Sequence, residues 1–176
     1  SHLYGCCTKM NANMDDYDSL EKVYCHPIQL SWTAVDGIRT PTFRDAAARM
    51  VYPFNEYLDS LVIELSKRDL PESAIRSSVE AATYALLGLA NQLACKQQRL
   101  SAFNDNSLVE YRKNSFKEVK SNTRSRGSVH QAKRTVNTKL RAIYRFLAEC
   151  QKARRLPIGF IGWSDCKVKS SLLDFD

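Results

Sequence analysis

Apolar residues recur at three- and four-residue steps along much of this chain, a spacing typical of amphipathic helices. The clearest stretch runs from Pro71 to Cys95 and predicts one long helix. Its apolar stripe alternates by four and three residues: Ile75, Val79, Ala82, Leu86, Leu89 and Leu93. Asp69 and Glu72 predict a capping box at its start. The other side carries small residues, which allow a second helix or a nucleic-acid backbone to approach closely: Ser77, Ala81, Gly88 and Asn91.

Weaker patterns predict helices on both sides of this segment. Residues 54–67 repeat apolar side chains at helical spacing, after a proline, Pro53, that kinks or restarts the chain. Further on, Ser107 and Glu110 form a capping-box pattern that opens a helix ending near residue 120. Its inward side is expected to hold Leu108, Tyr111 and Val119, with Phe116 at the margin.

The first fifty residues show the least regular pattern. Thr40 and Pro41 predict a short helix that ends at Met50, since proline suits a first helical turn. Residues 1–40 are interpreted as an N-terminal arm, irregular or with short extended structure between Tyr24 and Trp32. The arm holds three acids that lack the glycine turn and distal glutamate of a calcium loop, so a solvated patch is favoured: Asp15, Asp16 and Asp18.

The last long helix is predicted from the Ser128-x-x-Gln131 cap to about Ala153. On a helical projection one side of it is apolar: Val136, Leu140, Ile143, Leu147 and Cys150. The opposite side carries four cations, flanked by Asn137 and Thr138: Arg134, Arg141, Arg145 and Lys152. The pattern predicts that the apolar seam enters the core while the cations face outward, where such a helix can contact a DNA groove. A solvated charged surface is the alternative.

The charge distribution supports a polyanionic partner. The net charge is +7, but residues 111–155 alone hold fourteen Lys and Arg against two acids, an excess of +12 that leaves −5 for the remainder. A positive field this concentrated is typical of proteins that bind nucleic acids. The polar loop between the last two helices adds Arg124 and Arg126 as candidate backbone contacts, with Lys133 at the helix start. Arg76 and Ser77 are further candidates for a phosphate, with capping as the alternative for Ser77.

The six cysteines do not form a recognisable metal site. No C-x-x-C pair is present, and Cys6, Cys7, Cys25 and His26 match no common zinc spacing. Reduced cytosolic thiols are therefore favoured, with Cys95 as a small buried apolar residue. No metal or cofactor is expected. No apolar run reaches the length of a membrane span and no secretion signal is present, so a cytoplasmic protein without a membrane partner is expected.

Three segments taken in order resemble the SAM-like core-binding domain of tyrosine recombinases, the phage-integrase superfamily. They cover the region from Phe54 to Leu173 and are Leu70-Pro71-Glu72-Ser73-Ala74-Ile75-Arg76, Leu108-Val109-Glu110-Tyr111-Arg112, and residues 135–147. The last segment is similar to a T-x-N-x-x-L-x-x-(I/L)-x-x-F pattern of that family. The order of the helices, with a basic last one, also fits.

The resemblance implies an all-α fold, a compact bundle of four to five helices with an irregular N-terminal arm. It implies an arm at 1–40, a helical DNA-binding domain at 41–156 and a connector at 157–176 towards a catalytic domain. In that family the domain clamps duplex DNA, and its partners are the catalytic domain and other protomers. Such a protein acts in the bacterial cytoplasm or nucleoid, or is phage-encoded. None of the three histidines fits the family's H-x-x-R element, so no catalytic residue is assigned.

Two alternatives stay open at this point. One is a stand-alone basic helical protein that binds DNA as a regulator or an architectural factor, although residues 120–128 form too long a gap for a helix-turn-helix. The other is a helical protein-interaction bundle, for which the basic face has no ligand. Salt-dependent DNA binding distinguishes the nucleic-acid proteins from this bundle.

Overall fold

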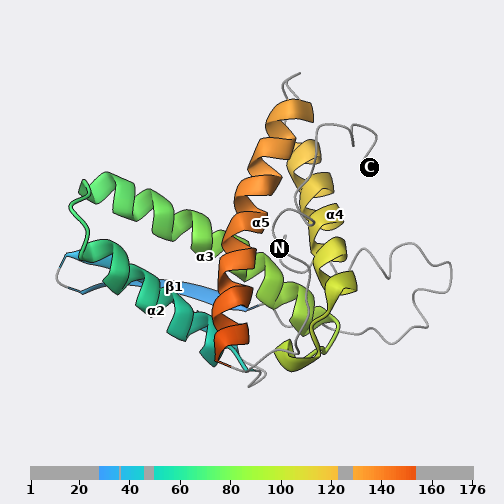
Figure 1. Ribbon diagram of the computed structural model, residues 1–176, viewed down its shortest axis with the longest axis horizontal. Helices are drawn as coiled ribbons and strands as arrows, with labels where there is room; N and C mark the ends of the chain where they lie inside the picture. Colours follow the sequence, from blue (N-terminus) through green and yellow to red (C-terminus); the bar gives the residue numbers. More distant parts are fainter. Residues whose placement is uncertain (1–27, 36, 46–49, 123–128, 154–176) are drawn as a thin grey trace, which may run out of the picture. The chain divides into compact units, whose positions relative to one another are not determined.

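The computed structural model describes residues 28–35, 37–45, 50–122 and 129–153. The chain divides between Arg99 and Leu100 into two compact units, which are described separately. Unit 1 contains β1 (Gln29–Val35), β2 (Ile38–Arg44), α2 (Tyr52–Ser66) and α3 (Glu72–Cys95), and unit 2 contains η3 (Leu100–Ala102), α4 (Asp105–Asn122) and α5 (Val129–Lys152) (Figure 1). The described chain is therefore mostly helical, as predicted, but not all-α.

A β-hairpin replaces the short helix that was predicted to start at Thr40. β1 and β2 are antiparallel, and the pairing of Val35 with Ile38 leaves a two-residue turn that contains Gly37 at φ 81°. An Asp-Gly pair between strand-forming residues is a strong hairpin signal, because this turn needs positive φ. The prediction was wrong because Pro41 suits an edge strand as well as a first helical turn.

Two asparagine side chains, one half-buried and one buried, bond the hairpin segment to the helices of unit 1. The Asn55 side chain in α2 accepts a hydrogen bond from Phe43 N at 2.7 Å and donates one to Phe43 O at 3.0 Å. The Asn91 side chain in α3 accepts a hydrogen bond from Ile28 N at 2.8 Å and donates one to Leu87 O at 3.0 Å. Asn55 thus satisfies both outward main-chain groups of Phe43, and Asn91 satisfies the N–H of Ile28.

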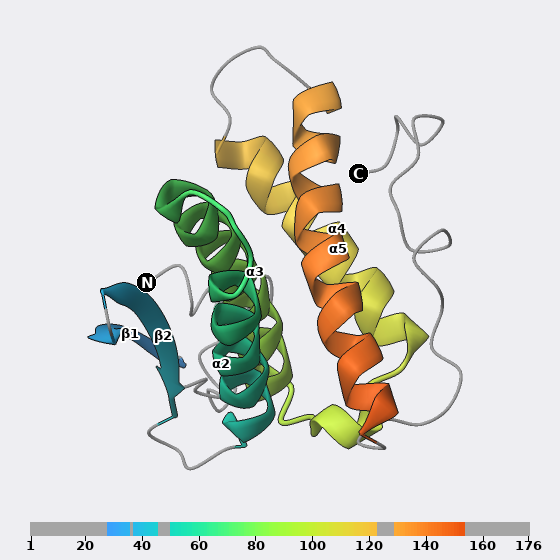
Figure 2. The ribbon, with the colours of Figure 1, turned by 60° about the vertical axis from the view of Figure 1, so that its left-hand side comes forward.

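Apolar packing between the hairpin and α2 and α3 forms the core of unit 1, and Figure 2 shows β2 between β1 and α2. Ile28 and Phe43 are each 1% exposed, and the ring centroids of Phe43 and Phe54 lie 6.2 Å apart. The predicted stripe of α3 is confirmed, since all six of its residues are buried. Asn91, predicted on the opposite side of α3, is buried as well, because it bonds to Ile28.

The predicted start of α3 at the Asp69–Glu72 capping box is not observed. Pro71 occupies the N-cap position, and no side chain bonds to the free N–H groups of the first turn. Asp69 lies two residues before the cap, so it is outside the position from which a side chain reaches those groups. At α2, the proline stands in the first turn without kinking the helix, which begins at Tyr52.

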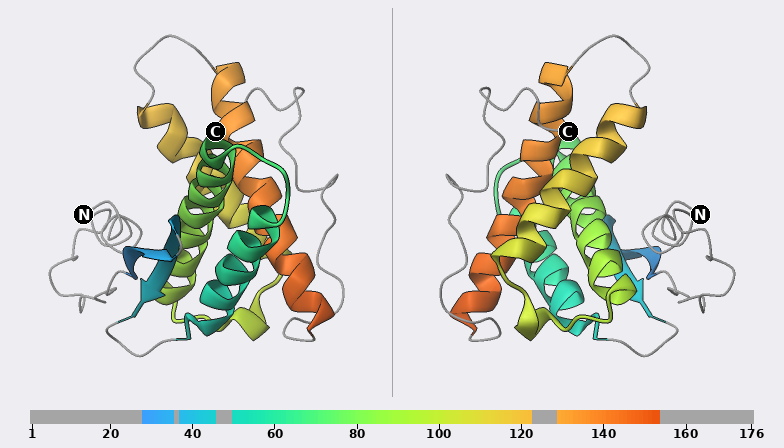
Figure 3. Two further views of the ribbon diagram at one scale, coloured as in Figure 1. Left: turned by 90° about the vertical axis from the view of Figure 1, so that its left-hand side faces the viewer. Right: turned by 90° about the vertical axis from the view of Figure 1, so that its right-hand side faces the viewer.

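The helices of unit 2 lie against each other, and α4 runs beside α5 (Figure 3). The cap of α4 differs from the prediction: Asn104 Oδ1 accepts a bond from Ser107 N at 3.0 Å, and Asn104 N donates to Ser107 Oγ at 3.4 Å. This is a capping box one turn earlier than the predicted pair of Ser107 and Glu110. Phe116, predicted at the margin, is 0% exposed and lies in the core.

Candidate nucleic-acid interface

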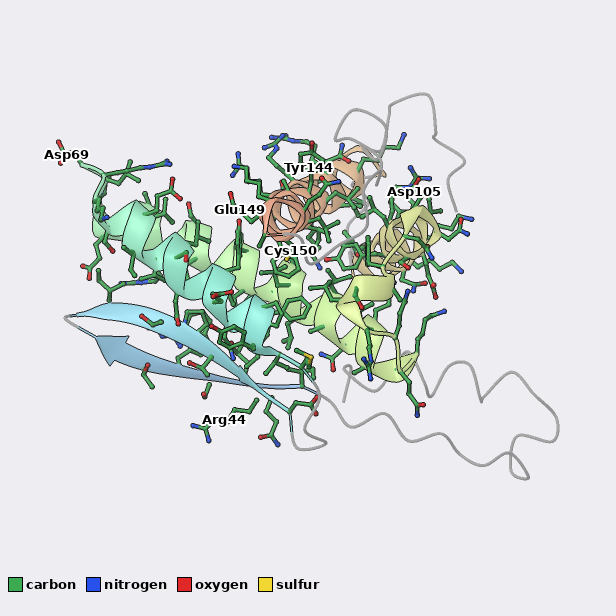
Figure 4. All side chains as sticks on the ribbon, turned by 60° about the horizontal axis from the view of Figure 1, so that its bottom comes forward. Arg44, Asp69, Asp105, Tyr144, Glu149 and Cys150 are labelled. Atoms are coloured by element: carbon green, nitrogen blue, oxygen red, sulfur yellow. The ribbon has the colours of Figure 1, made fainter. Side chains whose placement is uncertain are left out.

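The outward face of α5 carries the predicted row of cations, and its inward face is confirmed as a core seam. Val136, Leu140, Ile143 and Leu147 are each 0% exposed, and Cys150 is 3% exposed. The predicted cations on the opposite side are all exposed: Arg134, Arg141, Arg145 and Lys152. In Figure 4, which looks nearly along α5, nitrogen-tipped side chains extend from the helix on the side away from Cys150. We call these four residues the α5 cation row.

The α5 cation row is long enough to follow a nucleic-acid backbone. With a rise of 1.5 Å per residue, it extends over about 27 Å from Arg134 to Lys152. Lys152 Nζ lies 3.6 Å from Glu149 Oε2, an exposed pair that partly neutralises this end. Among the described residues, Arg134 and Arg145 make no ion pair. Arg134 and Arg145 therefore carry the least compensated positive charge in the row.

The two polar residues that flank the row have different surroundings. Thr138 is exposed, and its hydroxyl donates a hydrogen bond to Arg134 O at 3.0 Å, so its proton is already used within the helix. Its oxygen keeps accepting capacity towards a base amino group. Asn137 is half-buried and has an interaction within the protein, so it is less accessible than the row.

Lys133, predicted as a backbone contact, does not belong to this surface. It is 4% exposed and takes part in an interaction within the protein. Its position follows from the helix itself, because residue 133 lies about 60° from the seam residue Val136 on the helical projection. Its methylene stem thus contributes to packing, and a role in contacting DNA is not supported by its burial.

The remaining predicted contacts do not lie on α5. Arg76 and Ser77 belong to unit 1, where both are exposed on α3. Neither stands at the helix end. Ala74 N and Ile75 N already donate to Pro71 O, so the N–H groups that a cap or a phosphate could reach precede Ala74, and Ser77 neither caps α3 nor offers a free N–H group. Arg124 and Arg126 lie outside the described residues.

Sequence reasoning did not assign two cations of α4 that the structure exposes. Lys113 and Lys117 stand one turn apart on the outer side of α4, opposite its buried residues. Their spacing of four residues and their position opposite Leu108 and Tyr111 on a helical projection were the available signal. With them, both long helices of unit 2 present cations to solvent.

The inner side of α4 is buried from solvent. Tyr111 is 4% exposed, and burial raises the pKa of its phenol well above the ordinary value of 10.0, against the opposing effect of a side-chain hydrogen bond with Ser115. The hydroxyl of Tyr111 bonds with Ser115 on the same helix, so Tyr111 belongs to the interior and is not part of the solvent-facing surface.

Of the two cysteines that the structure describes, one departs from the expectation of reduced thiols. Cys95 is disulfide-bonded, whereas Cys150 is buried and forms no disulfide. The residues considered for zinc and the acids of the N-terminal arm lie outside the described residues. Within the described ranges, no helix combines the length and the apolar character that crossing a bilayer requires.

Comparisons with protein-family models, with curated proteins and with solved structures found no match for this chain.

Proposed function

We propose that this chain binds duplex DNA through the α5 cation row, as the core-binding domain of a tyrosine-type site-specific recombinase. The observation that carries the proposal is the division of α5 into a buried apolar seam and an exposed side with four cations and one acid, Glu149. A solvated surface helix normally mixes the two signs of charge more evenly. Phosphate oxygens are the ligands that such a row recognises.

The dimensions of α5 agree with a groove contact. An α-helix with its side chains is about 10–12 Å across, and the major groove of B-DNA is about 12 Å wide. Arg141 and Arg145 stand one turn apart, so their guanidinium groups can reach successive phosphates or base edges. The recombinase assignment itself is supported by the helix order, with the basic helix last, and by the sequence resemblance. The site of action proposed with it is the cytoplasm.

A salt titration of duplex binding tests the DNA-binding function. The full chain is mixed with a fluorescent duplex, and anisotropy is measured between about 50 and 200 mM salt. Four phosphate contacts predict a slope of about −3.6 in log K against log salt, from −0.9 per contact. Replacing both Arg134 and Arg145 by alanine should make the slope shallower by about 1.8.

Two further variants make the result specific. Replacing both Lys67 and Arg68 by alanine removes two exposed cations just after α2 and should change the slope little, so this double variant serves as the charge-matched control. Arg145→Lys keeps the charge but loses the planar fork, and it separates base contact, which it weakens, from phosphate contact, which it keeps. No binding at low salt would contradict DNA binding and favour a protein-interaction bundle.

The recombinase assignment has its own test. A gene that continues beyond residue 176 with a domain carrying arginines, an H-x-x-R element and a tyrosine would support it. DNA binding by a chain whose gene lacks this continuation would favour a stand-alone regulator or architectural protein.

The Cys95 disulfide is typical of an oxidising compartment rather than the cytoplasm. Alkylation and mass spectrometry of the chain from intact cells measure whether Cys95 is disulfide-bonded or reduced in the cell.

A further inference from the structure

The outer edge of β1 offers main-chain groups that nothing in the described chain bonds. The strand register and the contacts of Asn55 identify these groups. The N–H and C=O of Phe43 bond to Asn55, so they point away from β1. Leu30 is the residue paired with Phe43, so its own N–H and C=O point away from β2. By alternation, Trp32 and Ala34 also point outward. Among the described residues, no hydrogen bond reaches the main-chain groups of these three residues.

The two edges of the hairpin are protected very differently. On β2, Pro41 has no N–H to offer, Phe43 is bonded to Asn55, and Arg39 adds a charge. β1 (Gln29–Val35) has the sequence QLSWTAV, without a charge or a proline. Natural proteins usually protect exposed edge strands with such residues or cover them. The β1 edge therefore has the properties of a strand that is covered in the assembled protein.

We propose that this edge pairs with the same edge of a second copy of the chain, so that two hairpins form one four-stranded antiparallel sheet. The pairing is centred on Trp32, which lies opposite the partner's Trp32, while Leu30 lies opposite the partner's Ala34. This register satisfies the outward groups of all three residues with about six hydrogen bonds. The inference goes beyond DNA binding and does not depend on it.

A second copy fits this edge because the edge is complementary to itself. Just before β1, the outward N–H of Ile28 already donates a hydrogen bond to Asn91 Oδ1, so this group is not available to a partner. The open stretch thus runs from Leu30 to Ala34 and is symmetrical about its centre, as a two-fold axis requires. Both strands are uncharged, so no like charges meet. On the face away from the helices, Ser31 lies opposite the partner's Thr33, a pair whose hydroxyls can bond across strands.

The sharpest test removes one outward donor without disturbing the hairpin. Ala34 is exposed, and its N–H is not used in pairing with β2, so proline can stand there as Pro41 does in β2. Ala34→Pro removes about two of the six hydrogen bonds, one from each copy. Ala34→Val is the matched control, because it has similar bulk and keeps the N–H. Circular dichroism and thermal melting establish that both variants are folded.

Oligomeric state is measured on the full chain by sedimentation at concentrations up to about 1 mM, without DNA. The expected result is a weak dimer for the unchanged chain and Ala34→Val, and dimerisation weaker by about tenfold or more for Ala34→Pro. Amide exchange should show the Leu30, Trp32 and Ala34 N–H groups becoming protected as the dimer forms. These results would support the proposal whether or not the chain binds DNA.

Three outcomes would overturn it. A chain that stays monomeric at the highest concentration has no such pairing, and the edge is then left for another protein. Protection of the three amides in the monomer would mean that another part of the same chain covers the edge. A dimer of equal strength in the unchanged chain and in Ala34→Pro would use a different surface.

Discussion

Asn55→Ala tests how the hairpin is held to the helices. The variant removes both hydrogen bonds to Phe43, of 2.7 and 3.0 Å, and leaves the N–H and C=O of a residue that is 1% exposed without partners. Each of the two hydrogen bonds contributes about 0.5–1.5 kcal/mol net to stability, so their loss should lower the free energy of unfolding by about 2 kcal/mol. For a unit of this size, the melting temperature should fall by about 10 °C.

Trp32 provides a direct assay for unit 1. The chain has two tryptophans, Trp32 and Trp163, so a Trp163→Phe background makes the fluorescence report on the hairpin alone. Urea denaturation then gives the free energy of unfolding of this unit. Ser60→Ala, an exposed change on the same helix, controls for the helix-forming tendency of alanine.

Asn55→Asp adds a second comparison. An aspartate at this position can accept from Phe43 N but cannot donate to Phe43 O, so it should not restore stability. The reasoning would be refuted if Asn55→Ala lost no more stability than Ser60→Ala, because the asparagine would then have no structural role at the edge of β2.

Further predictions concern unit 2. Phe116→Ala should lower the free energy of unfolding by about 3–5 kcal/mol, measured by urea denaturation, because its ring is fully buried; a loss like that of a surface residue would contradict its place in the core. Lys133→Ala should lower stability while leaving the salt slope of DNA binding unchanged; a shallower slope with unchanged stability would show that its amine reaches DNA. The pKa of the Tyr111 phenol is raised by burial, so the unfolded chain ionises first and stability should fall as pH rises above about 10. Tyr111→Phe should reduce this alkaline loss in denaturation between about pH 8 and 11, and an unchanged pH dependence would contradict it.

The long helices were largely determined by the sequence. In α3 and α5, a run of more than twenty residues repeats the helical spacing many times, so the predicted stripes agree with the buried residues. The outward position of the α5 cation row followed from the same periodicity, because residues opposite a buried seam can only face away from it. What this row binds remains a proposal.

Short elements and single polar residues were decided by tertiary contacts. Residues 38–44 form a strand because β1 lies beside them, although proline and threonine equally suit a helix start. Asn55 and Asn91 cannot be distinguished from surface amides until the hairpin brings Phe43 and Ile28 to them. Lys133 and Phe116 lie at the borders of their helical stripes, where the neighbouring helix determines burial. Periodicity thus determined which faces of the long helices are buried. The pairing of β1 with β2 determined the sheet, the contact of Asn104 with Ser107 determined the α4 cap, and among these contacts only the bonds of Asn55 and Asn91 to the hairpin segment join residues distant in sequence.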